Sequence, residues 1–209
     1  MRPGWLAAGL CLAQVLTSEA APPRRPAPKS KPLPVQAKAD PVRDAQLFQE
    51  FGARVEQYVE LHKKLRKEAP PISDEASPYA IKAHKEALAK AIRGARAGAK
   101  PGDLIGVELQ PVLRRLLRTE LAGPGSGESR EAVLTEGNPR AEKTATPVVV
   151  AVNAVYPTDA PFSTVPPNIL IKLPTLPDHY LEYRFVGKDL VVRDAVADLI
   201  VDFMKEGVP

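Results

Sequence analysis

Apolar side chains recur at steps of three and four along residues 41–70, which is the spacing of one face of an α-helix. Asp40 is placed to cap this helix with Pro41 in the first turn, and Pro70 and Pro71 end the pattern. The stripe consists of Phe48, Phe51, Val55, Tyr58, His62 and Leu65.

A second helix is predicted to begin at Ser77 and Pro78, which repeat the cap and first-turn proline. The glycines at 98 and 102 end it. Its apolar stripe is Ile81, His84, Leu88, Ala91 or Ile92, and Ala95. The short connection predicts that the first two helices form an antiparallel hairpin.

The third apolar segment has Pro111 in its middle, and a proline inside a helix removes a backbone donor and clashes with the preceding turn. We therefore expect a short helical turn at 103–108 and a separate helix from about 110 to 121. The helix is predicted to bury Leu113, Leu116 and Leu117.

The pattern changes to β-branched residues in "TPVVVAVNAVYP", which predicts a mostly buried strand at 147–157. Prolines at 161, 166, 167, 174 and 177 exclude long regular elements from the next stretch. At most one helical turn fits there, around Asn168 to Leu173.

Strict alternation returns at residues 181–186, where Leu181, Tyr183 and Phe185 are separated by charged residues. Gly187 to Asp189 predicts a turn, 190–193 a returning strand, 194–198 a second turn and 199–204 a third strand. A terminal helix from Ala195 is the alternative, because it would place Asp194, Asp198 and Asp202 on one face. The run "LIVDF" favours the strand.

These patterns predict an α+β fold in which an N-terminal helical hairpin within a three-helix region, 41–122, precedes a small antiparallel β-meander module, 147–209. The Gly- and Ser-rich stretch 123–146 is interpreted as a linker that holds one helical turn around Glu131 to Leu134.

The first twenty residues have the pattern of a secretory signal peptide. Arg2 precedes the apolar run from Trp5 to Leu16, and small residues at Ser18 and Ala20 indicate cleavage after Ala20. The run is too short for a transmembrane helix of roughly twenty residues. We expect export to the periplasm or the extracellular space. The single cysteine, Cys11, follows Leu10 within this segment, which disfavours a lipid anchor and a disulfide framework.

Residues 21–40 are predicted to be a disordered, basic, proline-rich tether. The chain has 29 basic residues (Lys and Arg) and 25 acidic residues (Asp and Glu). The first forty residues hold six of the basic and two of the acidic residues, so residues 41–209 carry 23 basic and 23 acidic residues. The high pI therefore comes from the tether, and specific nucleic-acid binding is not expected. The tether has the charge for weak contact with an anionic surface, but a plain spacer is the favoured interpretation. An envelope protein or polymer is the expected partner, and no transmembrane segment is expected in the mature chain.

His62 and His84 raise the possibility of a metal site. They lie about equally far from the loop of the predicted hairpin, so both imidazoles can meet across it, with Glu60 or Glu86 as a carboxylate ligand. Zinc takes three or four ligands, and only His179 remains elsewhere. The alternative is that each histidine is a boundary residue of its helix stripe.

The aspartates of the C-terminal segment are interpreted as turn residues. Asp189, Asp194 and Asp198 stand where turns need side chains that hydrogen-bond their own backbone. A calcium loop instead alternates acids with glycine and ends in a bidentate glutamate.

Motifs for catalysis do not emerge from the sequence. It has no cysteine after Cys11, no HExxH, no SxxK and no glycine-rich phosphate loop, and "GPGSG" around Ser126 lacks the first glycine of a nucleophile elbow. We expect no enzymatic activity and no cofactor. The sequence favours an exported, non-catalytic binding or structural component, and metal binding through His62 and His84 is the alternative.

A resemblance rests on four ordered segments, "VEQYVELHKKLRKEAP", "AHKEALAKAIRGARAGAKPGDLI", "VNAVYPTDAPFSTVPPNIL" and "LPTLPDHYLEYRFVGKDLVVRDAVADLIVDFM". Together they resemble a group of secreted bacterial proteins that join a helical N-terminal half to a proline-rich β tail. The resemblance implies secretion and this architecture, and it brings no activity, cofactor or catalytic residue. The meander is also similar to small periplasmic β modules, including those of nickel and cobalt homeostasis regulators, but their histidine-rich segments are missing.

Overall fold

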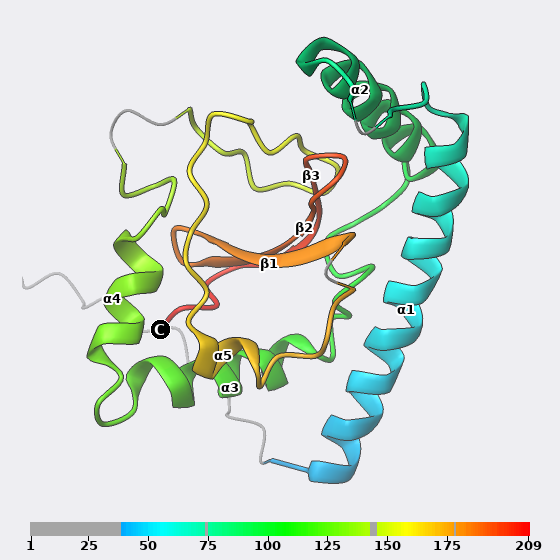
Figure 1. Ribbon diagram of the computed structural model, residues 1–209. Helices are drawn as coiled ribbons and strands as arrows, with labels where there is room; N and C mark the ends of the chain where they lie inside the picture. The colour runs from blue at the N-terminus through cyan, green and yellow to red at the C-terminus, as the bar shows by residue number, and fades with distance from the viewer. Residues whose placement is uncertain (1–38, 74, 143–145, 178) are drawn as a thin grey trace, which may run out of the picture. The chain divides into compact units, whose positions relative to one another are not determined.

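The computed structural model describes residues 39–209, apart from 74, 143–145 and 178. The predicted signal peptide and the tether up to residue 38 lie outside these residues. None of the described helices is long and apolar enough to cross a membrane. The elements in chain order are α1 (Pro41–Glu68), α2 (Pro78–Ala95), α3 (Gln110–Ala122), α4 (Gly127–Thr135), α5 (Pro167–Leu170), β1 (Leu181–Val186), β2 (Asp189–Asp194) and β3 (Leu199–Met204) (Figure 1). The predicted α+β class, helices followed by an antiparallel meander, is confirmed.

The first two helices begin at the predicted caps. The Asp40 carboxylate accepts hydrogen bonds from the backbone N–H groups of Val42 and Arg43, and Ser77 Oγ accepts one from Ala80. These side chains satisfy amides that lack partners in the first helical turn. The helices α1 and α2 contact each other as expected for a hairpin.

The helices α3 and α4 differ slightly from expectation. Pro111 lies in the first turn of α3, where its missing donor costs nothing, and the residues before it form turns. Leu113 and Leu117 are buried as predicted, whereas Leu116 is only half-buried. The single helical turn expected near residue 131 is the nine-residue helix α4, because Val133 is completely buried and anchors it.

The meander has the predicted three strands, although β2 begins at Asp189, which the sequence placed in the turn. Its strand order is β1-β2-β3 with antiparallel pairs, and Val186 pairs with Asp189 around Gly187, whose φ of 63° suits a tight hairpin turn. The second turn contains Asp198 at φ 51°, a left-handed conformation that aspartate tolerates better than most residues. Residues 199–204 form a strand, which decides against the helical alternative.

The strand predicted at 147–157 is wrong. This stretch makes only one isolated bridge, between Val155 and Leu199, and Tyr156 is its only buried residue. Asn153 adopts a φ of 63°, which interrupts the extended conformation that a strand requires. The apolar alternation still has a role, because Val148, Val150 and Val152 pack onto one face of the sheet.

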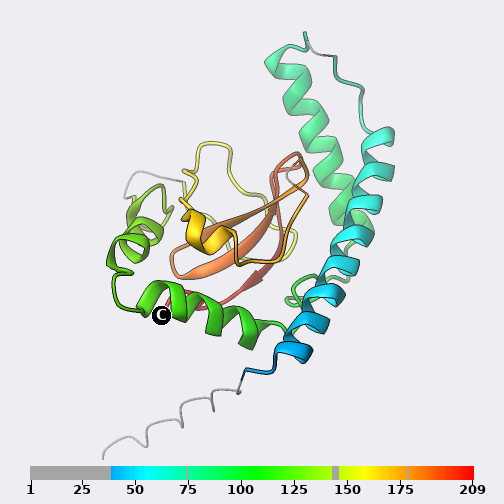
Figure 2. The ribbon, with the colours of Figure 1, turned by 60° about the horizontal axis from the view of Figure 1, so that its bottom comes forward.

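The sheet is covered on both faces, and this explains why β2 and β3 are buried throughout. On one face, the sheet packs against side chains from all five helices and forms the main core with them. This core includes Phe51, Leu88 and Leu117. The other face meets Tyr156 and the segment around it in a smaller cluster. In Figures 1 and 2 this segment, drawn in yellow, runs on the side of the sheet away from α3. The helical and β parts therefore share one core and belong to one compact unit.

Candidate functional site

The first strand of the meander is an open edge of the sheet. On the far side, β3 is covered by the segment around Asn153, which exchanges hydrogen bonds with Ile200 and donates one from Tyr156 N–H to the Asp198 carbonyl. No described strand pairs with the outer side of β1. An uncovered edge presents backbone donors and acceptors to any extended chain that approaches it.

The outer edge of β1 is closed at both ends and open in its middle. Leu181 N–H donates to the Pro177 carbonyl at 3.0 Å, and Phe185 N–H donates to Ser163 Oγ at 2.6 Å. Amides alternate in direction along a strand, so Tyr183 N–H also points away from β2. No hydrogen bond from this amide to another described residue is seen.

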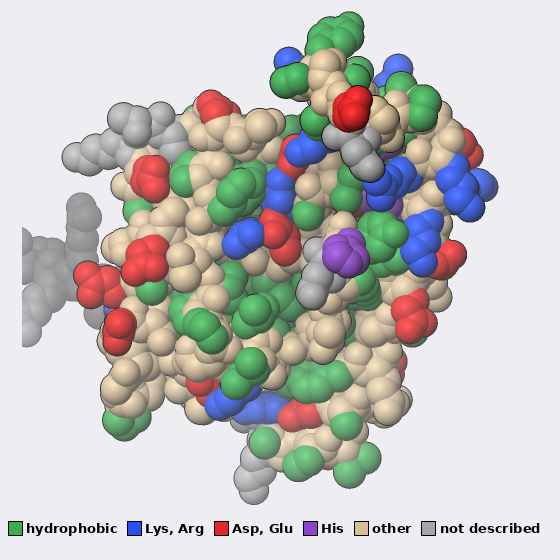
Figure 3. Space-filling view, in the orientation of Figure 1, with side chains coloured by type: hydrophobic (Ala, Val, Ile, Leu, Met, Phe, Trp, Pro, Cys, Tyr) green, Lys and Arg blue, Asp and Glu red, His purple; other side chains and the backbone are tan. Residues whose placement is uncertain are grey.

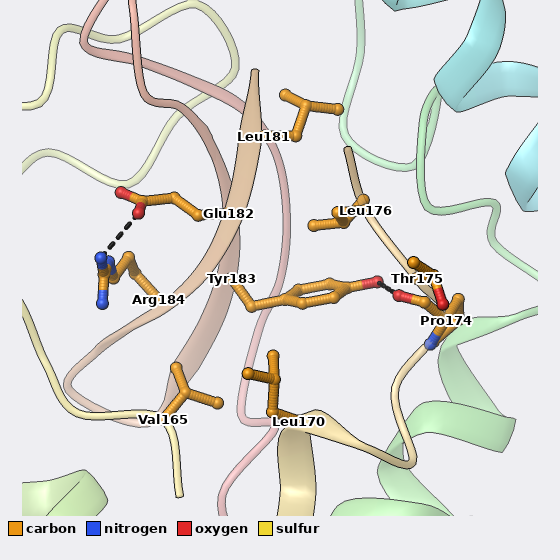
Figure 4. A pocket seen from close by; sticks show the side chains of 9 residues that line it. All are labelled: Val165, Leu170, Pro174, Thr175, Leu176, Leu181, Glu182, Tyr183 and Arg184. Carbon is orange, nitrogen blue, oxygen red and sulfur yellow. Dashed lines mark hydrogen bonds and ion pairs between the residues drawn. The ribbon is translucent and has the colours of Figure 1, made fainter. Parts of the chain in front are cut away.

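A pocket of about 360 Å³ lies beside this edge. One wall consists of residues 181–184, and the others include Val165, Leu170, Pro174 and Leu176 (Figure 4). Its volume is within the range of small-ligand pockets. In Figure 4 the ring of Tyr183 points toward Pro174, whereas Glu182 and Arg184 leave the strand on the opposite side.

The Tyr183 side chain fixes the opposite wall. Its hydroxyl donates to the Pro174 carbonyl at 2.9 Å. Burial raises the pKa of Tyr183 well above its ordinary value, so the hydroxyl stays protonated and remains a donor. The proline-rich segment is thereby held at a set distance from β1, which keeps the pocket between them open.

The other side of β1 carries a network of paired charges. Arg184 donates to Glu182 at 2.6 Å, and the same carboxylate also pairs with Arg193. Both guanidinium groups lie over the ring of Phe162, at 5.2 and 4.6 Å from its centre. Arg184 Nε is buried and has no hydrogen-bond partner among the described residues.

Three large apolar side chains near β1 are exposed. Leu170, which lines the pocket, is 51% exposed, Ile171 next to it in the chain is 80% exposed, and Phe162, whose ring Arg184 covers, is 43% exposed. Figure 3 shows hydrophobic side chains gathered across the middle of this face. Exposed apolar groups next to an open strand edge are typical of surfaces that bind another chain.

Of the two predicted metal-site residues, His62 lies on the buried face of α1 in a polar cluster. Its Nδ1 is 2.6 Å from Asp194 Oδ2, and Tyr58 donates its hydroxyl to the same oxygen at 2.7 Å. Burial raises the pKa of Asp194, but the hydrogen bond and charge of His62, with further bonds from Ala197 N–H and Tyr58, outweigh it and lower the pKa below its usual value.

The second predicted ligand, His84, is also buried but has a different partner. Its Nδ1 is 2.6 Å from the Pro70 carbonyl. No hydrogen bond or ring contact joins His84 to His62, and Nε2 of each ring is buried without a partner among the described residues. Within residues 39–209 as described, no three His, Cys, Asp or Glu side chains are grouped to hold a metal ion. His179 is exposed.

The aspartates of the meander tie distant segments to the sheet. Asp198 pairs with Lys85 and Arg193, and Asp189 pairs with Arg140 and Lys205. The buried Asp202 carboxylate accepts backbone hydrogen bonds from Gly102, Leu104 and Ile105. Asp194 accepts hydrogen bonds from the N–H groups of Val196 and Ala197 in its own turn, as predicted, whereas no such bond within the turn is seen for Asp189 or Asp198 among the described residues.

The sequence prediction missed the β1 edge, including Tyr183 and Arg184. The alternation showed which side chains face the core, but it carries no information on which strand lies at the edge. The prolines at 166, 167, 174 and 177 were the available signal, because a segment without amide donors pairs poorly with a neighbouring strand. Comparison of the chain with protein-family models, curated proteins and solved structures gave no match.

Proposed function

We propose that the protein is an exported, non-catalytic binding component that holds an extended peptide segment of an envelope protein against β1. The observation that carries this proposal is the Tyr183 backbone amide, a donor without a partner among the described residues, on an open strand edge beside a pocket. Export is supported by the signal-peptide pattern of residues 1–20.

The proposed partner binds by adding a strand. Tyr183 N–H and the outward carbonyls of β1 provide the backbone hydrogen bonds, which give affinity for any extended segment. Side chains then give specificity. Leu170 and Val165 offer an apolar contact, and the Arg184 guanidinium, whose Nε has no hydrogen-bond partner among the described residues, favours an acidic residue in the peptide.

Selection from a display library of random linear peptides tests this function. Peptides that are enriched on the immobilised protein are expected to contain an extended apolar stretch with an acidic residue. Their binding is expected to shift the Tyr183 amide resonance in heteronuclear NMR spectra, because that amide gains a hydrogen-bond acceptor.

A pocket-filling variant supplies the control. Thr175→Trp places a large side chain in the pocket and is expected to weaken peptide binding by about tenfold or more. Thr158→Trp makes the same change at an exposed position outside the pocket and is expected to have little effect. Equal binding by both variants, or an unmoved Tyr183 resonance, would contradict the proposed function.

Metal binding through His62 and His84 is a second candidate. Histidines that bind metals usually donate their other ring N–H to a carboxylate or a backbone carbonyl. His62 Nδ1 meets Asp194 and His84 Nδ1 meets the Pro70 carbonyl, and each Nε2 is left buried and unpartnered. Imidazole nitrogen suits copper, nickel or zinc.

Elemental mass spectrometry of the purified protein tests this candidate after incubation with each metal ion and removal of unbound ion. Stoichiometric metal that is lost in His62→Ala and in His84→Ala, but retained in His179→Ala, would support it. Metal-free protein, or loss in the exposed His179 variant alone, would exclude it.

A further inference from the structure

A second pocket, of about 560 Å³, lies beside the C-terminal half of α1. We call it the basic hollow. Helix α1 contributes Glu60 and four cations to its lining, and the remaining walls come from the α1–α2 connection, from α2 and from Tyr180. The cations are Lys63, Lys64, Arg66 and Lys67.

The charge of the basic hollow is only partly compensated. Glu60 is its single carboxylate, and Lys63 binds it at 2.8 Å. The other three cations have no ion-pair partner within the described part of the chain. The negative end of the helix dipole favours Arg66 and Lys67 in the last turn, but Lys64 precedes that turn. Repulsion among neighbouring cations is relieved when an anion binds between them.

Tyr180 adds a directional hydrogen-bond donor to the basic hollow. Its half-buried ring packs against His62, with the ring centres 4.9 Å apart, and no hydrogen bond from its hydroxyl to another described residue is seen. His84, which is only 3% exposed, also lines the hollow.

We infer that the basic hollow is a binding site for a phosphate group carried by a phosphomonoester or phosphodiester. Lysine and arginine are the usual protein ligands of phosphate, and a phosphate offers several acceptor oxygens to donors that converge from different directions. Lys64, Arg66 and Lys67 supply charge, and the Tyr180 hydroxyl supplies a directional hydrogen bond. This site shares no residue with the pocket beside β1, so it is independent of the proposed peptide binding.

Calorimetric titration with inorganic pyrophosphate, at low and at moderate salt, tests the inference. The protein used consists of residues 21–209, the chain without the predicted signal peptide. Lys64→Gln/Lys67→Gln removes two cations from the basic hollow. Lys82→Gln/Lys90→Gln removes two exposed cations from α2 outside it. Both variants lower the net charge equally, so they separate a local site from general attraction. The first is expected to weaken binding by about tenfold or more, and the second by less than about twofold.

Sedimentation with phosphatidylglycerol vesicles distinguishes a lipid headgroup from a soluble phosphate. If the basic hollow takes a headgroup, vesicle binding falls in Lys64→Gln/Lys67→Gln and pyrophosphate competes with it. If it takes a soluble phosphate, only the calorimetric titration shows the difference between variants. Equal losses in both double variants, or no binding of either probe to the wild-type protein, would overturn the inference.

Discussion

His62 Nδ1 lies 2.6 Å from Asp194 Oδ2, and both side chains are completely buried. Tyr58, one helical turn before His62, donates to the same oxygen, and two backbone amides donate to the other. Because a buried carboxylate is stable only when its oxygens are satisfied, this arrangement makes α1 and the end of β2 dependent on each other.

Asp194→Asn is expected to destabilise the protein by about 3 kcal/mol, because the amide leaves donors of Tyr58 or His62 facing an N–H group in the core. Urea denaturation followed by circular dichroism measures the change. Asp159→Asn, at an exposed position, is the control and is expected to stay within about 0.5 kcal/mol of wild type. Equal stability of the two variants would show that the cluster contributes little.

Leu88→Asp is expected to unfold the protein, because Leu88 is fully buried in the core that the helices share with the sheet. A charge without a partner at that depth costs more than about 4 kcal/mol, a large part of the stability of a small domain. Lys90→Asp introduces the same charge at an exposed position of α2. Thermal melting measures the stability of both variants. A Leu88→Asp variant with the same melting temperature as the wild type would contradict the packing described.

Asp202→Asn is expected to loosen the loop before α3 without unfolding the sheet. The carboxylate holds the backbone N–H groups of Leu104 and Ile105 at 2.9 and 2.8 Å. Hydrogen exchange at those two amides should speed up by on the order of tenfold, since a local opening requires less free energy than global unfolding. Asp103→Asn, whose carboxylate is exposed and binds Lys100 N–H, should leave both amides protected.

Alkaline pH is expected to unfold the protein. Burial raises the pKa of Tyr156 to about 12, and burial also raises the pKa values of Tyr58 and Tyr183. Unfolded tyrosine ionises near pH 10, so the stabilisation from these buried phenols is complete below about pH 10 and is lost as the pH rises beyond it. Ultraviolet absorbance should show these three tyrosines ionising together with the loss of helical circular dichroism. Their ionisation in a fully folded chain would contradict the burial described.

Local signals were sufficient to predict most of the regular structure. Proline after a capping side chain marked the starts of α1 and α2, and alternation with a glycine turn marked the β1–β2 hairpin. The prediction was wrong at 147–157 because a β-branched composition does not report the left-handed backbone of Asn153. It also underestimated α4, whose anchoring depends on the burial of Val133 against residues far away in the sequence.

The candidate sites were less accessible to sequence reasoning. Both histidines are buried, as their positions on apolar helix faces implied. Their hydrogen-bond partners depend on the tertiary fold. Tyr183 became a candidate only when the sheet order was known, because an amide is free only at an edge. The basic run at 63–67 is visible in the sequence, whereas its meeting with Tyr180 is a property of the fold.

The carboxylate of Asp194 is separated along the chain by 136 residues from Tyr58 and by 132 residues from His62. Contacts of such high sequence separation form late in folding, since a long loop must close before they become favourable. During synthesis, α1 and α2 emerge long before the strands that complete their core. We therefore expect the nascent chain to stay open until the strands of the meander have been made.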